Sequence, residues 1–263
     1  MSKYLSIGFW LLIAVYLFIV LGFVVGKQKK THCTSINVIL KDSLKYHFVE
    51  KDELVQIIDS EGGTVLGRAL DEINVSELEK MIVNLPYVKA AEVFKSINGE
   101  LNIEIVQRNP IIRIINENNL GFYIDNEGEL MPLSKKISLR LPVANGYIKF
   151  MPDFNTSVNI FSKEYKNDED AKVLRELSVL ANFINANKFW EAQIQQIYFN
   201  KDKEFELVPL VGTQIILLGK IDNYKDKFRN LEATYKKGFL YKGWNRYRKI
   251  NLKYHNQVIC EKK

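Results

Sequence analysis

Histidine and cysteine are the side chains that most often ligate metals or activate a nucleophile, and this 263-residue chain has few of either. The three histidines, His32, His47 and His255, occur in no H-E-x-x-H arrangement and at no zinc-ligand spacing from a cysteine. No serine stands in a G-x-S-x-G nucleophile elbow. Cys33 and Cys260 could form a disulfide outside the cytoplasm, but two free or buried thiols are the favoured interpretation. We therefore expect no metal and no cofactor.

Two short patterns look like chemical motifs but have simpler explanations. The segment Gly62–Gly67 is glycine-rich, but Arg68 follows it where a phosphate-binding loop has Lys and then Ser or Thr, so a turn is favoured. Asp125 and Glu127 could suggest acid–base chemistry, but no second cluster accompanies them, and turn formation explains them better. These absences predict a non-enzymatic binding protein without a small-molecule substrate.

An uncharged, mostly apolar run of 22 residues, Tyr4–Val25, could anchor such a protein in a membrane. As a helix it would be about 33 Å long, enough to cross a bilayer core of about 30 Å. No small-x-small cleavage pattern follows it, so a retained anchor is favoured over a signal peptide. Residues 1–3 would then be a cytoplasmic stub and residues 26–35 a juxtamembrane linker. Lysines at 27, 29 and 30 favour a cytoplasmic body by the positive-inside rule, whereas short anchors commonly translocate a long following domain, so the sequence leaves orientation open.

Charge is distributed unevenly along the chain. Residues 224–263 hold 12 Lys and Arg against 3 Asp and Glu, a balance of +9, whereas residues 31–223 hold 21 against 28, a balance of −7. Two interpretations of this basic tail are open: a solvated face, or the more specific one of a docking surface for an acidic partner. Its apolar and basic side chains could bind nucleic acid, form a protein interface or pack on their own domain, and a membrane tether makes nucleic acid the least favoured. These residues are Phe239, Leu240, Tyr241, Lys242, Trp244, Arg246, Tyr247, Arg248 and Lys249.

The segment 36–108 predicts a small unit with the order β-α-α-β-β. A strand over 36–40 precedes a helix over 50–60 and a second helix that begins at Asn74, with Glu77 in a capping-box relation. Strands over 88–96 and 100–107 flank Asn98-Gly99, a pair that favours a type I′ turn.

The segment 109–259 predicts a larger mixed β-sheet with flanking helices, followed by a short tail over 260–263, so the fold class is α+β. The last strand, predicted over about 250–259, is expected at a sheet edge, where its unpaired backbone groups could accept a partner strand. Whether the loop at 160–170 is ordered stays open. The other expected strands cover 111–115, 122–125, 194–199, 205–209 and 214–218, and the expected helices cover 170–186 and 224–236, with Phe228, Leu231 and Tyr235 inward.

An ordered series of motifs resembles the bacterial cell-division family FtsQ/DivIB. The resemblance extends from Ile36 to about Val258 and includes the single N-terminal anchor. The first unit is similar to the family's POTRA domain and the second to its β domain. The matching segments are Leu85–Val93, Leu101–Ile105, Arg108–Pro110, Phe122–Gly128, Pro209–Gly212, Leu217–Gly219, Lys227–Leu231 and Ile250–Tyr254.

The resemblance implies a non-enzymatic scaffold of the divisome in the cell inner membrane, with a single pass, the N-terminus inside and the body outside the cytoplasm at the septum. Its implied partners are divisome proteins, especially small single-pass coiled-coil proteins of the FtsB/DivIC and FtsL type. The implied partner-binding residues are Lys253, Tyr254 and Asn256 in the terminal strand. The alternative function is a POTRA-containing accessory of polypeptide transport or outer-membrane assembly.

Overall fold

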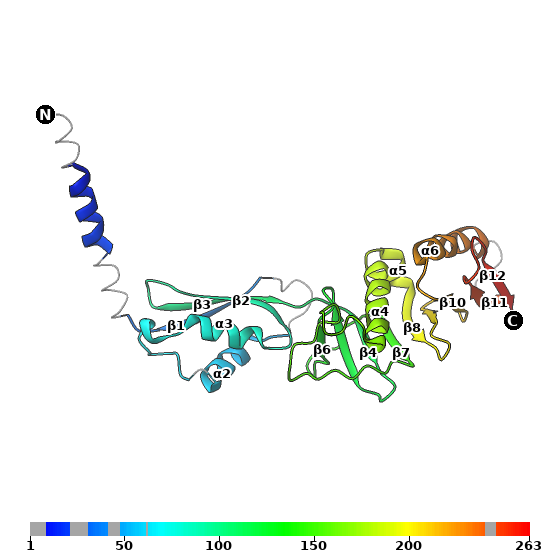
Figure 1. The fold of residues 1–263 in the computed structure, drawn as a ribbon, viewed down its shortest axis with the longest axis horizontal. Helices are drawn as coiled ribbons and strands as arrows, with labels where there is room; N and C mark the ends of the chain where they lie inside the picture. Colours follow the sequence, from blue (N-terminus) through cyan, green and yellow to red (C-terminus); the bar gives the residue numbers. More distant parts are fainter. Residues whose placement is uncertain (1–8, 22–30, 42–47, 62, 240–245) are drawn as a thin grey trace. The chain divides into compact units, whose positions relative to one another are not determined.

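The computed structural model describes residues 9–21, 31–41, 48–61, 63–239 and 246–263 (Figure 1). The chain divides into two compact units, Met1–Gln107 and Arg108–Lys263, and each is described here by itself. The predicted membrane span, residues 4–25, falls only partly within the described chain, where a helix covers residues 9–21. The predicted stub 1–3 and the linker residues 26–30 lie outside it. Within the described ranges, no helix is both long enough and apolar enough to cross a membrane.

In the first unit, two helices lie on the same side of a sheet whose described strands have the order β1-β3-β2 (Figure 1). Strand β1 is parallel to β3, and β2 is antiparallel to β3. The predicted β-α-α-β-β order is confirmed. The elements are β1 (Ser35–Leu40), α2 (Lys51–Glu61), the short 3-10 helix η1 (Leu70–Glu72), α3 (Val75–Val83), β2 (Val88–Lys95) and β3 (Glu100–Gln107).

Helix α3 begins at its predicted cap. The side-chain oxygen of Asn74 accepts a 3.3 Å hydrogen bond from the backbone N–H of Glu77, which satisfies one of the donors that a helix start leaves unpaired. Leu78 and Ile82, one turn apart, are buried. On the same helix, the Glu79 carboxylate accepts a 2.9 Å hydrogen bond from the backbone N–H of Val93. Helix α3 is therefore held to the edge strand β2 by polar contact as well as by packing.

The β2–β3 hairpin forms where predicted, but the predicted type I′ turn is wrong. That turn needs positive φ at both Asn98 and Gly99, and only Gly99 has it, at 92°. The Ser96 N–H donates to the Glu100 carbonyl at 2.8 Å, and the Gly99 N–H donates back to the Ser96 carbonyl at 3.2 Å. The loop thus has three residues, with glycine at the positive-φ position. A Cβ at position 99 would also lie 2.8 Å from the carbonyl oxygen of His32, so the approaching chain excludes a side chain there.

Residues 31–34, which the sequence assigned to a linker, belong to the first unit. The Cys33 N–H donates to the Arg68 carbonyl at 2.8 Å. On the other side, the Thr34 N–H donates to the Gly99 carbonyl at 2.8 Å. Backbone hydrogen bonds on both sides fix this segment between a turn and the hairpin tip.

The second unit is built on a large mixed sheet, as predicted, whose described strands run in the order β12-β11-β10-β9-β8-β7-β4-β5-β6. Its parallel pairs are β4–β7, β7–β8 and β10–β11. Its elements are β4 (Pro110–Ile115), β5 (Gly121–Asp125), β6 (Leu130–Pro132), β7 (Val143–Gly146), α4 (Glu169–Asn185), α5 (Lys188–Gln193), β8 (Ile194–Phe199), β9 (Phe205–Pro209), β10 (Ile215–Gly219), α6 (Tyr224–Ala233), the π-helix η2 (Thr234–Phe239), β11 (Tyr247–Asn251) and β12 (Ile259–Lys262).

One row of directly paired side chains crosses this sheet. Paired residues on neighbouring strands point to the same face, so the row defines one surface. In sheet order it runs through Phe122, Ile114, Ala144, Ile197, Leu207, Ile216 and Ile250. All of these are fully buried, in one cluster with Leu174 of α4, Trp190 of α5 and Phe228 of α6. The row ends on β12 at Cys260, which pairs with Ile250 and is only partly buried.

Several features of the second unit were not predicted, among them the three-residue strand β6. Strand β7 has only four residues, too few for a clear period-2 pattern. The six-residue helix α5 begins at Asn187, whose side-chain oxygen accepts the N–H groups of Phe189 and Trp190. Helix α6 starts as predicted, but after Ala233 the backbone widens into a π-helix, which still buries Tyr235, as predicted.

The turn after β5 accounts for Asp125. Its carboxylate is fully buried and accepts hydrogen bonds from the backbone N–H groups of Glu127 and Glu129, both at 2.8 Å. The Arg108 guanidinium completes the set at 3.1 Å. These contacts support the turn interpretation over acid–base chemistry, since the carboxylate is occupied by structural donors.

A single arginine organises the loop whose order the sequence left open. The Arg175 guanidinium on α4 donates to the carbonyls of Ile160, Tyr165, Lys166 and Asp168, at 3.0, 2.7, 3.2 and 3.4 Å. The side chain of Asp168 in turn accepts the N–H groups of the first turn of α4. The loop is therefore part of the folded unit.

Replacing Arg175 by alanine should release this loop. The lost charge-assisted hydrogen bonds should lower the free energy of unfolding by roughly 1–3 kcal/mol. Trypsin should then cut at Lys163 or Lys166, inside the loop, well before the rest of the domain, which mass spectrometry would show. The control is Arg140→Ala, at an exposed arginine. Equal trypsin resistance of the two variants would contradict the role assigned to Arg175.

Candidate partner-binding site at the C-terminal sheet edge

Strand β12 forms one edge of the large sheet. It pairs with β11 on one side and with no described strand on the other. Ile259, Glu261 and Lys262 are exposed. The unpaired N–H and C=O groups of such an edge can accept a strand from another chain.

The predicted continuous terminal strand over 250–259 is wrong. Strand β11 ends at Asn251, whose side-chain oxygen accepts the backbone N–H of Lys253 at 3.0 Å and so gives the backbone a local alternative to the ladder. Leu252 turns into the core, with 2% of its surface exposed. The chain then reverses and passes through Asn256 at φ 55°, a left-handed conformation that asparagine tolerates. The chain end is two antiparallel strands, and β12 is the edge.

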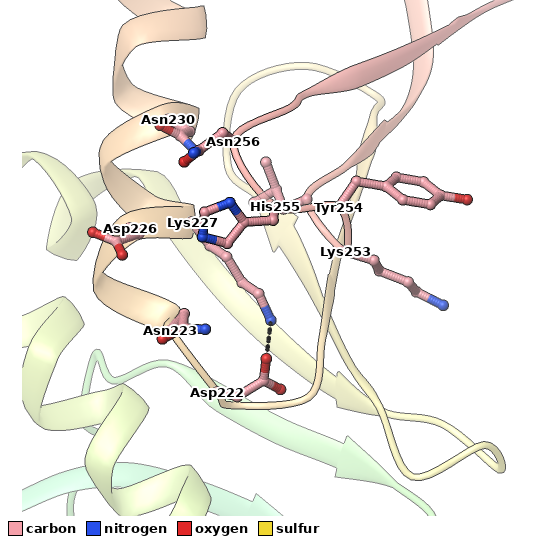
Figure 2. A pocket seen from close by; sticks show the side chains of 10 residues that line it. Asp222, Asn223, Asp226, Lys227, Asn230, Lys253, Tyr254, His255 and Asn256 are labelled. Atoms are coloured by element: carbon pink, nitrogen blue, oxygen red, sulfur yellow. Dashed lines mark ion pairs between the residues drawn. The ribbon is translucent and has the colours of Figure 1, made fainter.

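The three predicted binding residues therefore lie on the β11–β12 loop and not in a strand (Figure 2). Lys253 forms an ion pair with Glu204 on the loop between β8 and β9. Tyr254 is 54% exposed, and its ring points away from α6. Asn256 lies beside Asn230 of α6. The structure thus gathers the three residues on one loop and presents the tyrosine ring outward.

A polar cavity of about 60 Å³ separates this loop from the first turns of α6 (Figure 2). Lys227 lies in it; its ammonium donates to the Lys220 carbonyl at 2.7 Å and lies 3.7 Å from the Asp222 carboxylate. Burial lowers the pKa of Lys227, and Asp222 opposes this shift only in part. Lys227 therefore acts as an internal tie. Asn223, Asp226, Asn230 and the loop residues 252–256 also line the cavity.

The described residues around the edge are mostly basic. Arg246, Lys262 and Lys263 are exposed, and Arg248 is paired with Glu261 across β11 and β12. Tyr247 packs against the core, which favours local packing for that part of the predicted basic–aromatic tail. Residues 240–245, which include Leu240, Tyr241, Lys242 and Trp244, lie outside the described chain.

Neither cysteine is arranged for redox or metal chemistry. Cys33 and Cys260 are free thiols, and burial raises the pKa of both. Within the described ranges, no group of three or more His, Cys, Asp and Glu side chains is placed to hold a metal ion.

Two family models match the chain, one in each unit. The model described as FtsQ/DivIB, C-terminal related, matches residues 109–261, more than half of the sequence. The chain belongs to the FtsQ/DivIB family. The model for the POTRA-like domain matches residues 31–106. No curated protein matches the chain.

Membership makes this a cell-division protein of a non-catalytic family. The match of the FtsQ/DivIB model reaches residue 261 and so includes most of β12, which places the sheet edge inside the family's domain. The POTRA-like match begins at residue 31, whose carbonyl accepts the Leu70 N–H at 3.0 Å.

Sequence reasoning missed the edge strand itself, Ile259–Lys262. The signal for the preceding turn was present in the five polar residues Lys253–Gln257, which include an asparagine and a histidine between two apolar stretches. Ile250 and Leu252 alternate as in a strand, and the strand prediction carried that alternation too far.

The left-handed conformation at Asn256 gives a direct test of the loop. Asn256→Val should destabilise the β domain by about 1–2 kcal/mol, because a β-branched side chain opposes positive φ. Asn256→Gly should leave stability within about 0.5 kcal/mol of the parent. Denaturant unfolding of both variants measures the difference. Equal stability of the two would mean that the loop does not turn at this residue.

Proposed function

We propose that this FtsQ/DivIB member is a non-enzymatic, membrane-anchored scaffold of the bacterial divisome, which links septum-assembly proteins by docking an extracytoplasmic segment of a partner on β12. The observation that carries the proposal is the open edge of β12 in the domain matched by the family model. The partners are small single-pass coiled-coil proteins of the FtsB/DivIC and FtsL type, bound by strand addition.

Backbone hydrogen bonds along so short an edge cannot supply all of the binding free energy, so side chains must contribute. β12 has four residues, and alternate residues of a strand direct their N–H and C=O groups to the same side, so about four backbone hydrogen bonds are available. At about 0.5–1.5 kcal/mol each, these fall short of the roughly 8 kcal/mol of micromolar affinity. Exposed apolar surface beside the edge can supply the remainder, as 54% of Tyr254 and 48% of Ile259 are exposed.

The charge of the edge sets the chemistry of the partner. Glu261 is already paired with Arg248, whereas Arg246, Lys262 and Lys263 are exposed around the strand. A partner strand that carries acidic residues fits this field, which speeds encounter and disfavours the pairing of two copies of this basic edge.

The membrane anchor in this proposal is the apolar run Tyr4–Val25. Its described part, the helix over 9–21, exposes large apolar side chains, among them Trp10 at 67%, Leu12 at 70% and Phe18 at 82%. Lipid is a suitable environment for such a surface. The proposed location is the cell inner membrane, with the N-terminus inside and the body outside the cytoplasm, where anchored partners share the same surface.

Tyr254→Glu should weaken partner binding by more than about tenfold, because interface tyrosines commonly contribute above 1–2 kcal/mol and the new carboxylate would oppose an acidic strand. Because 54% of Tyr254 is exposed, stability should change by no more than about 0.5 kcal/mol. Affinity measured by biolayer interferometry against the purified partner segment, with parallel unfolding curves, checks this. The matched control is Tyr147→Glu in the same domain, at a ring 49% exposed. Equal affinities of the two variants would remove Tyr254 from the interface.

A fluorescent fusion of the full chain should form a mid-cell band during division. The physical reason is capture by anchored partners that are themselves confined to the septum. A uniform envelope signal, together with co-purification of an outer-membrane barrel, would instead support an accessory of polypeptide transport or outer-membrane assembly.

A further inference from the structure

Two loop tips flank the point where the chain enters the POTRA-like domain. On one side the Gly67 N–H donates to the Cys33 carbonyl at 2.8 Å, and His32 is bridged to Ala69 in antiparallel fashion. On the other side the Gly99 carbonyl accepts the Thr34 N–H. The turn at residues 65–68 and the tip of the β2–β3 hairpin therefore share one end of the domain with residue 31. We name it the anchor-proximal end.

Each tip carries an exposed apolar side chain near its glycine: Leu66 directly before Gly67, and Ile97 two residues before Gly99. Ile97 at the hairpin tip is 68% exposed, and Leu66 in the turn is 44% exposed. Neither position requires an apolar residue for the fold, since the core of the unit is formed by other side chains. Exposed apolar residues scattered singly are ordinary, and Ile39, Val83 and Phe94 of this unit are exposed too, but Ile97 has the largest exposed fraction among them and both tips lie at the end where the chain enters.

Covalent geometry limits how far this end can lie from the bilayer. Five residues, 26–30, separate the end of the apolar run from Thr31. The six steps from Val25 to Thr31, at about 3.3–3.6 Å per residue when fully extended, span at most about 22 Å. The polar headgroup layer on each side of the hydrocarbon core is about 5–8 Å thick. This end of the domain can therefore reach the headgroup layer, and a modest attraction between the two is enough to bring them into contact.

Charge supplies part of that attraction. Three of the five connecting residues are lysines, at 27, 29 and 30, and such juxtamembrane clusters favour anionic headgroups. On the domain, Arg68 and Lys95 lie next to the tips along the chain, and the acidic neighbours are Asp71, Glu72 and Glu100, with Asp59 accepting a hydrogen bond from the Val65 N–H at 3.3 Å. Arg68 and Glu72 are 4.0 Å apart, so one carboxylate of this end is paired, and the connecting lysines supply most of the attraction to anionic headgroups.

We propose that the anchor-proximal end of the POTRA-like domain rests on the lipid surface, with Ile97 and Leu66 inserted at the boundary between headgroups and acyl chains. The inference rests on the membrane anchor of the proposed function. Loop tips with single apolar side chains insert shallowly and reversibly. Contact of both tips with lipid would fix the orientation of the domain relative to the membrane. It would also limit the positions that a docked partner can occupy.

The test places an environment-sensitive fluorophore at the tip of the full-length protein reconstituted in vesicles of phosphatidylglycerol and phosphatidylcholine. Ile97→Cys in a Cys260→Ser background offers one accessible thiol, because Cys33 is only 2% exposed. With NBD attached, emission should shift to the blue, and nitroxide-bearing lipids should quench it several-fold more than in the control. A second label at Leu66→Cys should behave like the first, and it replaces the first if that variant fails to fold.

The matched control is a label at Val83→Cys, a position 39% exposed at the end of α3. It lies near the start of β2, which pairs with the end of β3 and so is remote from the hairpin tip. Equal quenching at positions 97 and 83 overturns the proposal, since no other protein is present to cover the tips. Flotation of the vesicles distinguishes failure of the membrane anchor from failure of the lipid contact. A chain that does not float with the vesicles refutes the anchor. A chain that floats but whose labelled tips are not quenched refutes only the lipid contact.

Discussion

The β domain depends on the unbroken row of buried side chains that runs across its sheet from Phe122 to Ile250. Each member fixes the register of the next, because a slip of one residue would turn an apolar side chain to the opposite face. The three helices α4, α5 and α6 close over this row and form a single core with it. At β12 the row ends in the partly buried Cys260, so the core holds the edge strand in place but does not enclose it.

This arrangement shows how so short a strand is held in place for the docking role proposed for it. Four residues alone would fray, but Cys260 packs on the core, and the Arg248–Glu261 ion pair joins β12 to β11 on the exposed side. The β11–β12 loop is held independently, through the Lys253–Glu204 ion pair and the buried Leu252. The surface proposed for docking is thus held by contacts within the chain itself, which would limit the conformational entropy lost on association.

Polar side chains elsewhere serve the backbone. Asp125 accepts two backbone N–H groups and the Arg108 guanidinium at the start of the β domain, and Arg175 donates to four carbonyls of one loop. Glu79 accepts a backbone N–H at the edge of β2. Asp125, Arg175 and Glu79 therefore stabilise the fold, in a chain whose family is non-catalytic.

The sequence by itself determined the α+β class, the order of elements in the first unit and most of the strands and helices of the second, because period-2 and period-3.6 apolar patterns and caps such as Asn74 act locally. Its ordered motifs also indicated the family. Tertiary structure decided what depends on distant partners: the three-residue hairpin turn, where Gly99 must admit the chain at His32, and the inclusion of residues 31–34 in the first domain. It also decided the edge. Ile250 and Leu252 alternate as in a strand, and only the Asn251 side chain, the burial of Leu252 beside β10 and the left-handed Asn256 divide that stretch into β11, a loop and β12.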